Sequence, residues 1–357
     1  MTTRHLARYS TNSCNRGYVA DMSCSLNRSP TTEVSQTQST GKVTVSGDRW
    51  LKRFFRELEG AGVKPMHEGS PDAARAQIRD VAMLNGIGPV MHRVTDDSVA
   101  VAGGGSVPVR ILVPVARPRA VIVYYHGGGW IGGSIDSSET IARKLAERTA
   151  SAFVLVGYRL APENPYPAAV EDAYAALQWV SSRLGEIAGG EVPLIVAGDD
   201  AGGNLAAVVA LRARDQHGPS IDRQILVCPI LGFEADRSTP LDGENLWVGP
   251  ETIEWFWEQY LPDGGRDQAH ASPLLATDLG GLPPAIVVTA EHSPARAGAE
   301  QYAQRLRQAG VAVDLQLYHG QIHGFFNTLM LPQGERAFQQ VIKAIRARSV
   351  RPAPSTL

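Results

Sequence analysis

The chain has 357 residues and a formal net charge of −2, with 34 Lys and Arg against 36 Asp and Glu. This length fits one large domain or two smaller ones, and the near-neutral balance excludes a basic footprint for nucleic acid or for an anionic membrane surface. No apolar run reaches the roughly 18 residues needed to cross a bilayer. The three cysteines, Cys14, Cys24 and Cys228, are too few and too scattered for a disulfide framework or a metal site. We therefore expect a reduced cytoplasmic protein without metal or cofactor.

Residues 1–42 are rich in Ser, Thr, Asn and Arg and show no periodicity, which predicts a disordered N-terminal tail. The run 50–58 has apolar residues at helical spacing. Apolar runs typical of strands follow at 107–113, 120–125, 153–157, 193–197, 224–228, 285–289 and 313–318. Helical patterns alternate with them at about 138–149, 167–184, 203–215, 296–309 and 335–348, and residues 351–357 form a short C-terminal tail.

Strands that alternate with helices predict a mostly parallel sheet with helices on both faces. We accordingly expect an α/β fold in which residues 43–350 form a single domain.

The segment Gly198-Asp199-Asp200-Ala201-Gly202 lies between an apolar strand and a helix-forming run. This order is typical of the nucleophile elbow, in which G-x-S-x-G places a serine at a sharp strand-to-helix turn. The residue at the tip is Asp200. Its carboxylate is therefore a nucleophile, an acid or base, or the mark of a lost nucleophile.

A glycine loop, His126-Gly127-Gly128-Gly129-Trp130, follows the strand 120–125. Glycines let the backbone turn sharply and leave N–H groups free to face a developing negative charge. The sequence YRLAPE at 158–163 and IHGF at 322–325 complete a set of motifs in a fixed order. Together they resemble the hormone-sensitive-lipase family of α/β-hydrolases, also called bacterial family IV esterases, from about Asp48 to Arg348.

The resemblance implies the α/β-hydrolase fold, with an eight-stranded, mostly parallel sheet and a helical cap formed by about 45–95 and 235–265. It identifies His323 as the catalytic histidine and assigns the oxyanion hole to the backbone N–H groups of Gly127, Gly128 and Ala201. It also implies that the substrate pocket is lined by His126, Trp130, Trp255 and Tyr260. For the aromatic segment 250–260, packing within the cap is an equally good interpretation.

The chain departs from the family at several positions besides the tip. The triad aspartate should lie in the segment 290–298, and its place holds Ser293. Gly157 replaces the acidic or amide residue that usually precedes YRLAPE, and Ser138-Glu139 replaces a His-Asp pair after the glycine loop. Changes around one pocket indicate a divergence of function.

We therefore expect an enzyme that acts on a small, apolar, oxygenated molecule through a pair, Asp200 and His323, in place of the Ser-His-Asp triad. Asp200 can attack carbon and form an aspartyl ester that water then hydrolyses, as in haloalkane dehalogenases and epoxide hydrolases of this fold. It can also exchange a proton with His323 in an elimination, a cyclisation or an epoxide opening. Two alternatives stay open: a disabled binding protein, as the plant gibberellin receptor is, and a conventional carboxylesterase that uses a different serine.

Some residues have a second interpretation. Ser293 is first of all a loop-capping serine before Pro294, and Asp200 can be a solvated carboxylate in a dead pocket. Glu234 and Asp236, after the sixth strand, lie where some relatives of this fold keep an alternative acid for the histidine. The only partner expected is the small-molecule substrate, with neither nucleic acid nor membrane, and a homodimer is left open.

Overall fold

The computed structural model describes residues 60, 62–101, 103–232, 248–329 and 332–347. The chain divides into two units, 1–43 and 44–357, and all described residues lie in the second. The predicted tails, the helix expected at 50–58 and the candidate acids Glu234 and Asp236 lie outside the described residues.

One sheet of eight strands organises the second unit, in the order β1-β2-β4-β3-β5-β6-β7-β8. β1 pairs antiparallel with β2, and β2 pairs antiparallel with β4, whereas all other neighbours are parallel. Every strand expected from the sequence is present, and β1, which sequence analysis placed partly in the cap, completes the eight. The strands are β1 (Arg93–Ala100), β2 (Ser106–Val113), β3 (Val121–Tyr125), β4 (Ala152–Val156), β5 (Leu194–Asp199), β6 (Arg223–Val227), β7 (Ala285–His292) and β8 (Val313–Ile322).

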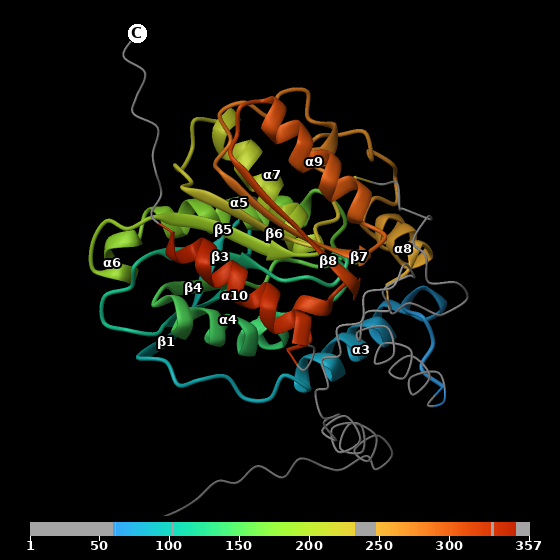
Figure 1. Ribbon diagram of the computed structural model, residues 1–357, viewed down its shortest axis with the longest axis horizontal. Coiled ribbons are helices and arrows are strands. Elements are labelled where there is room, and N and C mark those ends of the chain that lie inside the picture. The colour runs from blue at the N-terminus through green and yellow to red at the C-terminus, as the bar shows by residue number, and fades with distance from the viewer. Residues whose placement is uncertain (1–59, 61, 102, 233–247, 330–331, 348–357) are drawn as a thin grey trace, which may run out of the picture. The chain divides into compact units, whose positions relative to one another are not determined.

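Helices cover both faces of this sheet (Figure 1), so the predicted fold class is confirmed. α4 (Ile135–Thr149) and α10 (Pro332–Arg346) pack together on one face. The other face carries α5 (Ala168–Ser181), α7 (Ala201–Asp215) and α9 (Arg296–Gln308), with the short α6 (Leu184–Ala188) near the sheet margin. The central strands β3, β4, β5 and β6 are buried along their whole length, which explains why their sequences are mainly apolar runs rather than alternating patterns. Within the described ranges, no helix is long and apolar enough to span a membrane.

The register of the parallel strands brings the sequence motifs to one edge. Tyr125 of β3 pairs with Gly198 of β5, so the glycine loop and the elbow leave the sheet at the same level. β7 and β8 end nearby, with an irregularity between Ala290 and His292. Loops at the carboxyl ends of parallel strands form the usual binding crevice of such sheets.

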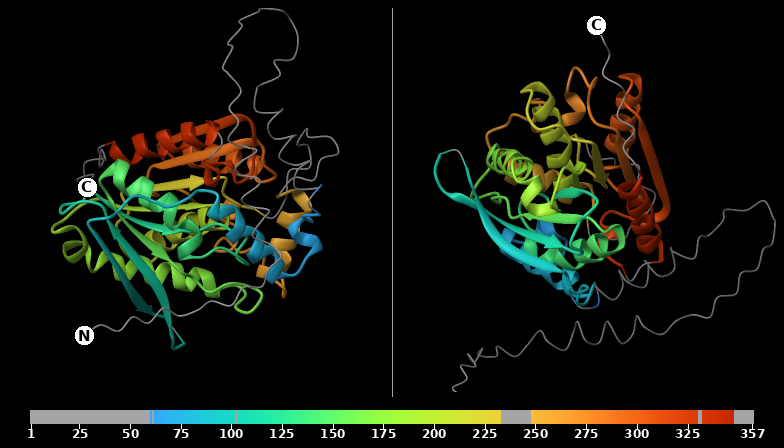
Figure 2. Two further views of the ribbon diagram at one scale, coloured as in Figure 1. Left: turned by 90° about the horizontal axis from the view of Figure 1, so that it is seen from below. Right: turned by 90° about the vertical axis from the view of Figure 1, so that its left-hand side faces the viewer.

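Two helices and a short 3-10 turn lie beside this edge, in the place expected for a cap: η1 (Met66–Glu68), α3 (Pro71–Met83) and α8 (Pro250–Tyr260) (Figures 1 and 2). α3 begins at Pro71 because the Ser70 side chain accepts the N–H of Ala73 at 3.2 Å and proline suits the first helical position. His67 Nδ1 lies 3.0 Å from Thr252 Oγ1, which joins η1 to α8. Two further 3-10 turns, η2 (Pro273–Leu275) and η3 (Phe325–Asn327), follow later in the chain.

Candidate active site

The elbow has the backbone that the sequence predicts. β5 ends at Asp199, α7 begins at Ala201, and Asp200 between them has φ 55° and ψ −121°. A non-glycine residue at positive φ costs on the order of 1–3 kcal/mol and is found mainly at functional sites. Gly202 must be glycine because a Cβ there would clash with the Tyr125 carbonyl oxygen of the neighbouring strand. The strained turn of a nucleophile elbow is thus retained around an aspartate.

The carboxylate of Asp200 lies where the glycine loop is expected to form an oxyanion hole. Its Oδ2 accepts the N–H groups of Gly128 at 2.8 Å and Gly129 at 2.7 Å, and the Ala201 N–H also bonds to the carboxylate. Its Oδ1 lies 2.9 Å from Nε2 of His323. The side chain is only 11% exposed, so protein donors take the place of water at both oxygens.

The prediction that Gly127 contributes to this hole is wrong. Its N–H donates instead to Oδ1 of Asp199, at 3.1 Å. Gly128 and Gly129 both have positive φ, 119° and 59°, and this turn directs their amides toward the elbow. The donors are therefore the second and third glycines of the loop, together with Ala201.

His323 is held between two side chains. Its Nε2 faces Asp200, and its Nδ1 lies 2.9 Å from Oγ of Ser293, which also accepts the Ala295 N–H at 3.3 Å. Ser293 is thus both the loop-capping serine and the partner of the histidine. Because an ionised carboxylate can only accept, Nε2 carries a proton, and Nδ1 of a neutral ring then accepts the Ser293 hydroxyl. A serine hydrolase has the opposite arrangement, with the proton on Nδ1 and Nε2 free to act as the base.

Two adjacent buried carboxylates have opposite pKa shifts. Burial raises the pKa of Asp200, but hydrogen bonds from His323 and the backbone outweigh it, and the pKa lies below its ordinary value. Burial raises the pKa of Asp199 to about 6, with a further contribution from the charge of Asp200, despite hydrogen bonds from Tyr124 at 2.6 Å and Asn327 at 2.5 Å. At neutral pH the carboxylate of Asp200, which faces His323, is therefore ionised.

His126 supports the glycine loop from inside. Burial lowers the pKa of its imidazole to about 4, so the ring is neutral. Nδ1 lies 2.9 Å from the Gly127 carbonyl oxygen, and the ring stacks on Tyr158 with centroids 4.3 Å apart. The Tyr158 hydroxyl donates to the His126 carbonyl oxygen at 2.7 Å. His126 also lines the pocket, as predicted.

A mainly apolar pocket opens above Asp200 and His323 between cap and sheet. Its apolar wall comes from η1, α3, α4, α8 and neighbouring loops: Met66, Ile78, Val81, Ala82, Ile141, Val248, Phe256 and Ile322. Several polar wall residues already have partners, since Asn85 donates to the Asn327 carbonyl oxygen and Asn327 donates to Asp199. The pocket therefore suits a small molecule that is largely hydrocarbon.

Three aromatic residues predicted to line the pocket do not. Trp130 and Tyr260 are fully buried and stack on each other, with centroids 4.4 Å apart and planes at 1°. In the described part of the chain, the wall contains Phe256 but neither these two nor Trp255. Successive helical residues point about 100° apart, so Trp255 faces away when Phe256 faces inward. Tyr260 stacks on Trp130, and Trp255 packs against Phe256, so these contacts favour packing over substrate contact for both residues.

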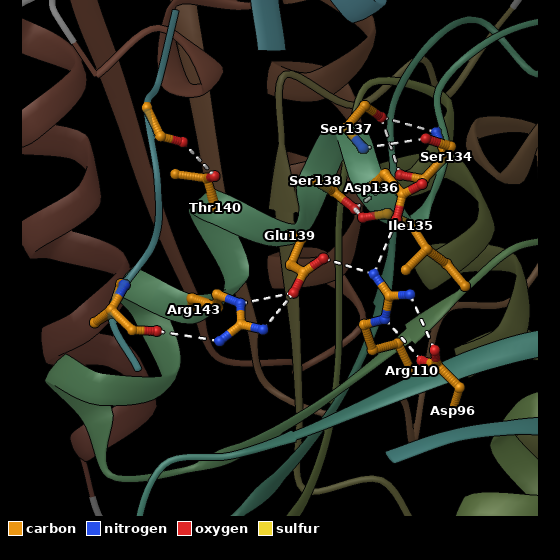
Figure 3. A network of polar contacts seen from close by, with 12 residues as sticks. Asp96, Arg110, Ser134, Ile135, Asp136, Ser137, Ser138, Glu139, Thr140 and Arg143 are labelled. Atoms are coloured by element: carbon orange, nitrogen blue, oxygen red, sulfur yellow. Dashed lines mark hydrogen bonds and ion pairs between the residues drawn. The ribbon is translucent and has the colours of Figure 1, made fainter. Parts of the chain in front are cut away.

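Ser138 and Glu139, which stand in place of the family's His-Asp pair, belong to a structural network at the start of α4 (Figure 3). Glu139 accepts from Arg110 at 2.6 Å and from Arg143 at 2.6 Å, and Arg110 also binds Asp96. Ser138, at the pocket wall, donates to backbone carbonyl oxygens at 3.0 and 3.1 Å. This departure thus anchors α4 to the antiparallel end of the sheet.

Comparison with known proteins shows the family of the chain. Residues 122–327 match the model of a family described as alpha/beta hydrolase fold. Carboxylesterase NlhH of Mycobacterium tuberculosis is 38% identical over 287 residues, which cover 77% of this chain and 88% of that protein. Carboxylic ester hydrolase LipN of the same organism is 41% identical over 290 residues, 77% of this chain and 76% of that protein. The structure of a hyperthermophilic esterase from Pyrobaculum calidifontis superposes with a TM-score of 0.76 at 34% identity, covering 83% of this chain and 97% of that one.

Proposed function

Because this chain belongs to the alpha/beta hydrolase fold family, we propose that it is a hydrolase for small, largely apolar molecules in which Asp200 replaces the serine nucleophile. The family and the carboxylesterase relatives support the hydrolase class. The observation that carries the role of Asp200 is the position of its Oδ2, which is bound by the N–H groups of Gly128 and Gly129.

That position suits hydrolysis through an aspartyl ester. Oδ1 attacks an electrophilic carbon of the substrate, a C–O bond forms, and the leaving group departs with the electron pair of the broken bond. Water then attacks Cγ of the ester while Nε2 of His323, with the ring proton now on Nδ1 toward Ser293, takes a proton from the water. The negative charge of this step develops on Oδ2, where the backbone donors already lie. The bond between Cγ and Oδ1 then breaks, the product leaves with Oδ1 and the proton from His323, and the Asp200 carboxylate is restored with one oxygen from water. The oxyanion hole, which serves the substrate carbonyl in a serine esterase, here serves the side chain of the enzyme.

A second candidate is conventional ester hydrolysis by a different serine. The relatives favour it more strongly than they favour an aspartyl ester, since they are a carboxylesterase and a carboxylic ester hydrolase. The geometry is less favourable to it. Ser293 lies on the Nδ1 side of His323, and the pocket serines Ser137 and Ser138 donate to the Ser134 carbonyl oxygen. An ester carbonyl would also compete with Asp200 for the hole.

Turnover in heavy-oxygen water distinguishes these mechanisms. The protein is incubated with a panel of epoxides, haloalkanes and p-nitrophenyl esters, and the peptide that contains Asp200 is weighed after turnover. Heavy oxygen in the Asp200 carboxylate supports the aspartyl ester, with Asp200→Ala as the control. Ester hydrolysis that a fluorophosphonate abolishes, with the adduct mapped to a serine, would replace it by the second candidate. Binding of these compounds without any turnover would contradict both and favour a disabled binding protein.

A further inference from the structure

One arginine joins the cap to the glycine loop and to the YRLAPE segment. Arg75 lies in α3, and its Nε donates to the carbonyl oxygen of Ile131 at 2.7 Å. One Nη donates to the carbonyl oxygen of Ala161 at 3.0 Å, and the two Nη atoms bind Glu163 at 2.6 and 2.9 Å. Ile131 directly follows the glycine loop, so a single guanidinium joins α3 to two other segments of the chain.

The same face of α3 forms part of the pocket wall. Ile78 lies one turn after Arg75, and it lines the pocket together with Val81 and Ala82. Ile78 packs so closely on Gly132 that a Cβ at this glycine would overlap its Cδ1. The position of this wall over Asp200 therefore depends on how α3 is seated on the loop that follows the oxyanion glycines.

We propose that Arg75 is a positioning residue that fixes the α3 wall of the pocket on the oxyanion loop. The hydrogen bonds of Arg75 to the carbonyl oxygens of Ile131 and Ala161 hold α3 in a fixed position on these two segments. Planar guanidinium reaches two carbonyl oxygens and a carboxylate at once, which a lysine ammonium at the end of a flexible chain cannot reproduce. The Glu163 side chain is 57% exposed, so its ion pair is the weaker part of the anchor. This role goes beyond the proposed function because it does not depend on which reaction Asp200 performs.

Hydrogen exchange of α3 tests the role without any substrate. The variants are Arg75→Met, Arg75→Lys and Glu163→Gln in the full chain. Arg212→Met is a matched control, because Arg212 binds Glu171 bidentately at 2.8 and 3.1 Å between α7 and α5 and its side chain is 17% exposed, against 20% for Arg75. In Arg75→Met we expect the amides of 71–83 to exchange about tenfold faster or more, as expected when a local contact is lost, with β5 and α7 unchanged.

The expected ranking of the variants distinguishes a local anchor of α3 from a general effect on the stability of the protein. Arg75→Lys should recover only part of the protection, Glu163→Gln should have a smaller effect than Arg75→Met, and Arg212→Met should leave α3 unchanged. Binding of Nile red, a neutral apolar probe of the pocket, should weaken in Arg75→Met and not in Arg212→Met. The proposal is overturned if the α3 amides of Arg75→Met exchange at the wild-type rate. It is also overturned if Arg212→Met speeds the exchange of these amides as much as Arg75→Met does. Because neither hydrogen exchange nor Nile red binding needs turnover, the result does not depend on whether Asp200 acts as a nucleophile.

Discussion

Converting the elbow back to a serine enzyme is the strongest test of how this site is built. In Asp200→Ser the carboxylate leaves the oxyanion hole, and the N–H groups of Gly128 and Gly129 become available to an ester carbonyl. His323 Nε2, which now faces a carboxylate, would face a hydroxyl. For Nε2 to accept the serine proton, the ring must carry its own proton on Nδ1.

The magnitude depends on what stands at Nδ1. Ser293 lies there at 2.9 Å, but a neutral hydroxyl does not favour the Nδ1–H tautomer or stabilise an imidazolium as a carboxylate does. In serine proteases, loss of the aspartate that orients the histidine lowers kcat on the order of 10⁴. We therefore expect weak ester hydrolysis from Asp200→Ser alone. Asp200→Ser with Ser293→Asp should hydrolyse esters about 10² to 10⁴ times faster than Asp200→Ser alone. The range extends below 10⁴ because Ser293, still present in the single variant, holds the His323 ring in part of its orientation.

The assay is kcat/KM for short p-nitrophenyl esters in four proteins: wild type, each single variant and the double variant. The gain in the double variant should exceed the product of the single effects, and the native reaction should fall. His323→Ala in the double variant is the control for a triad mechanism. If Asp200→Ser alone reaches the rate of the double variant, another acid already serves His323, and the reasoning about Ser293 is refuted. A folded double variant without ester hydrolysis would show that the pocket does not admit esters.

Other predictions address the same region. The pKa of Asp199, about 6 against an ordinary 3.8, implies that folding is weakened by about 3 kcal/mol as the pH rises from about 4 to 6. In urea unfolding, Asp199→Asn should remove this pH dependence between about pH 4 and 6, and an unchanged pH slope would contradict the assignment. Gly129→Ala should destabilise by more than about 1 kcal/mol, because φ is 59° and a Cβ would clash with an aromatic ring, whereas Gly190→Ala, in open space, should be nearly neutral in the same experiment. Asp200→Ala and His323→Ala should lower the native activity by similar factors, and the double variant little further, because members of one unit are not additive; independent, multiplying losses would exclude the pair.

The sequence alone determined the fold class and the place of the site. The elbow and the glycine loop are local structures. Their backbone conformations require glycines at positions only a few residues apart, so short motifs identify them. The alternation of strands and helices then brings these motifs to one edge of a parallel sheet. β1 was not predicted because its polar, largely exposed sequence at the margin of the sheet lacks a clear apolar alternation. The order of the motifs also placed His323 beside the elbow, although 123 residues separate it from Asp200.

Only the tertiary structure decided which atoms meet. That Asp200 turns its Oδ2 into the oxyanion hole, and that the second glycine rather than the first supplies a donor, depends on the backbone dihedrals of a loop from another strand. The contact of Ser293 with His323 depends on where two neighbouring strands end, and the inward side of α8 depends on the rotation of a helix about its axis. Hydrogen bonds are sensitive to differences of a few tenths of an ångström and to side-chain rotamers. A sequence pattern contains neither the exact distances nor the rotamers, because both are fixed by packing between segments that are distant in the chain.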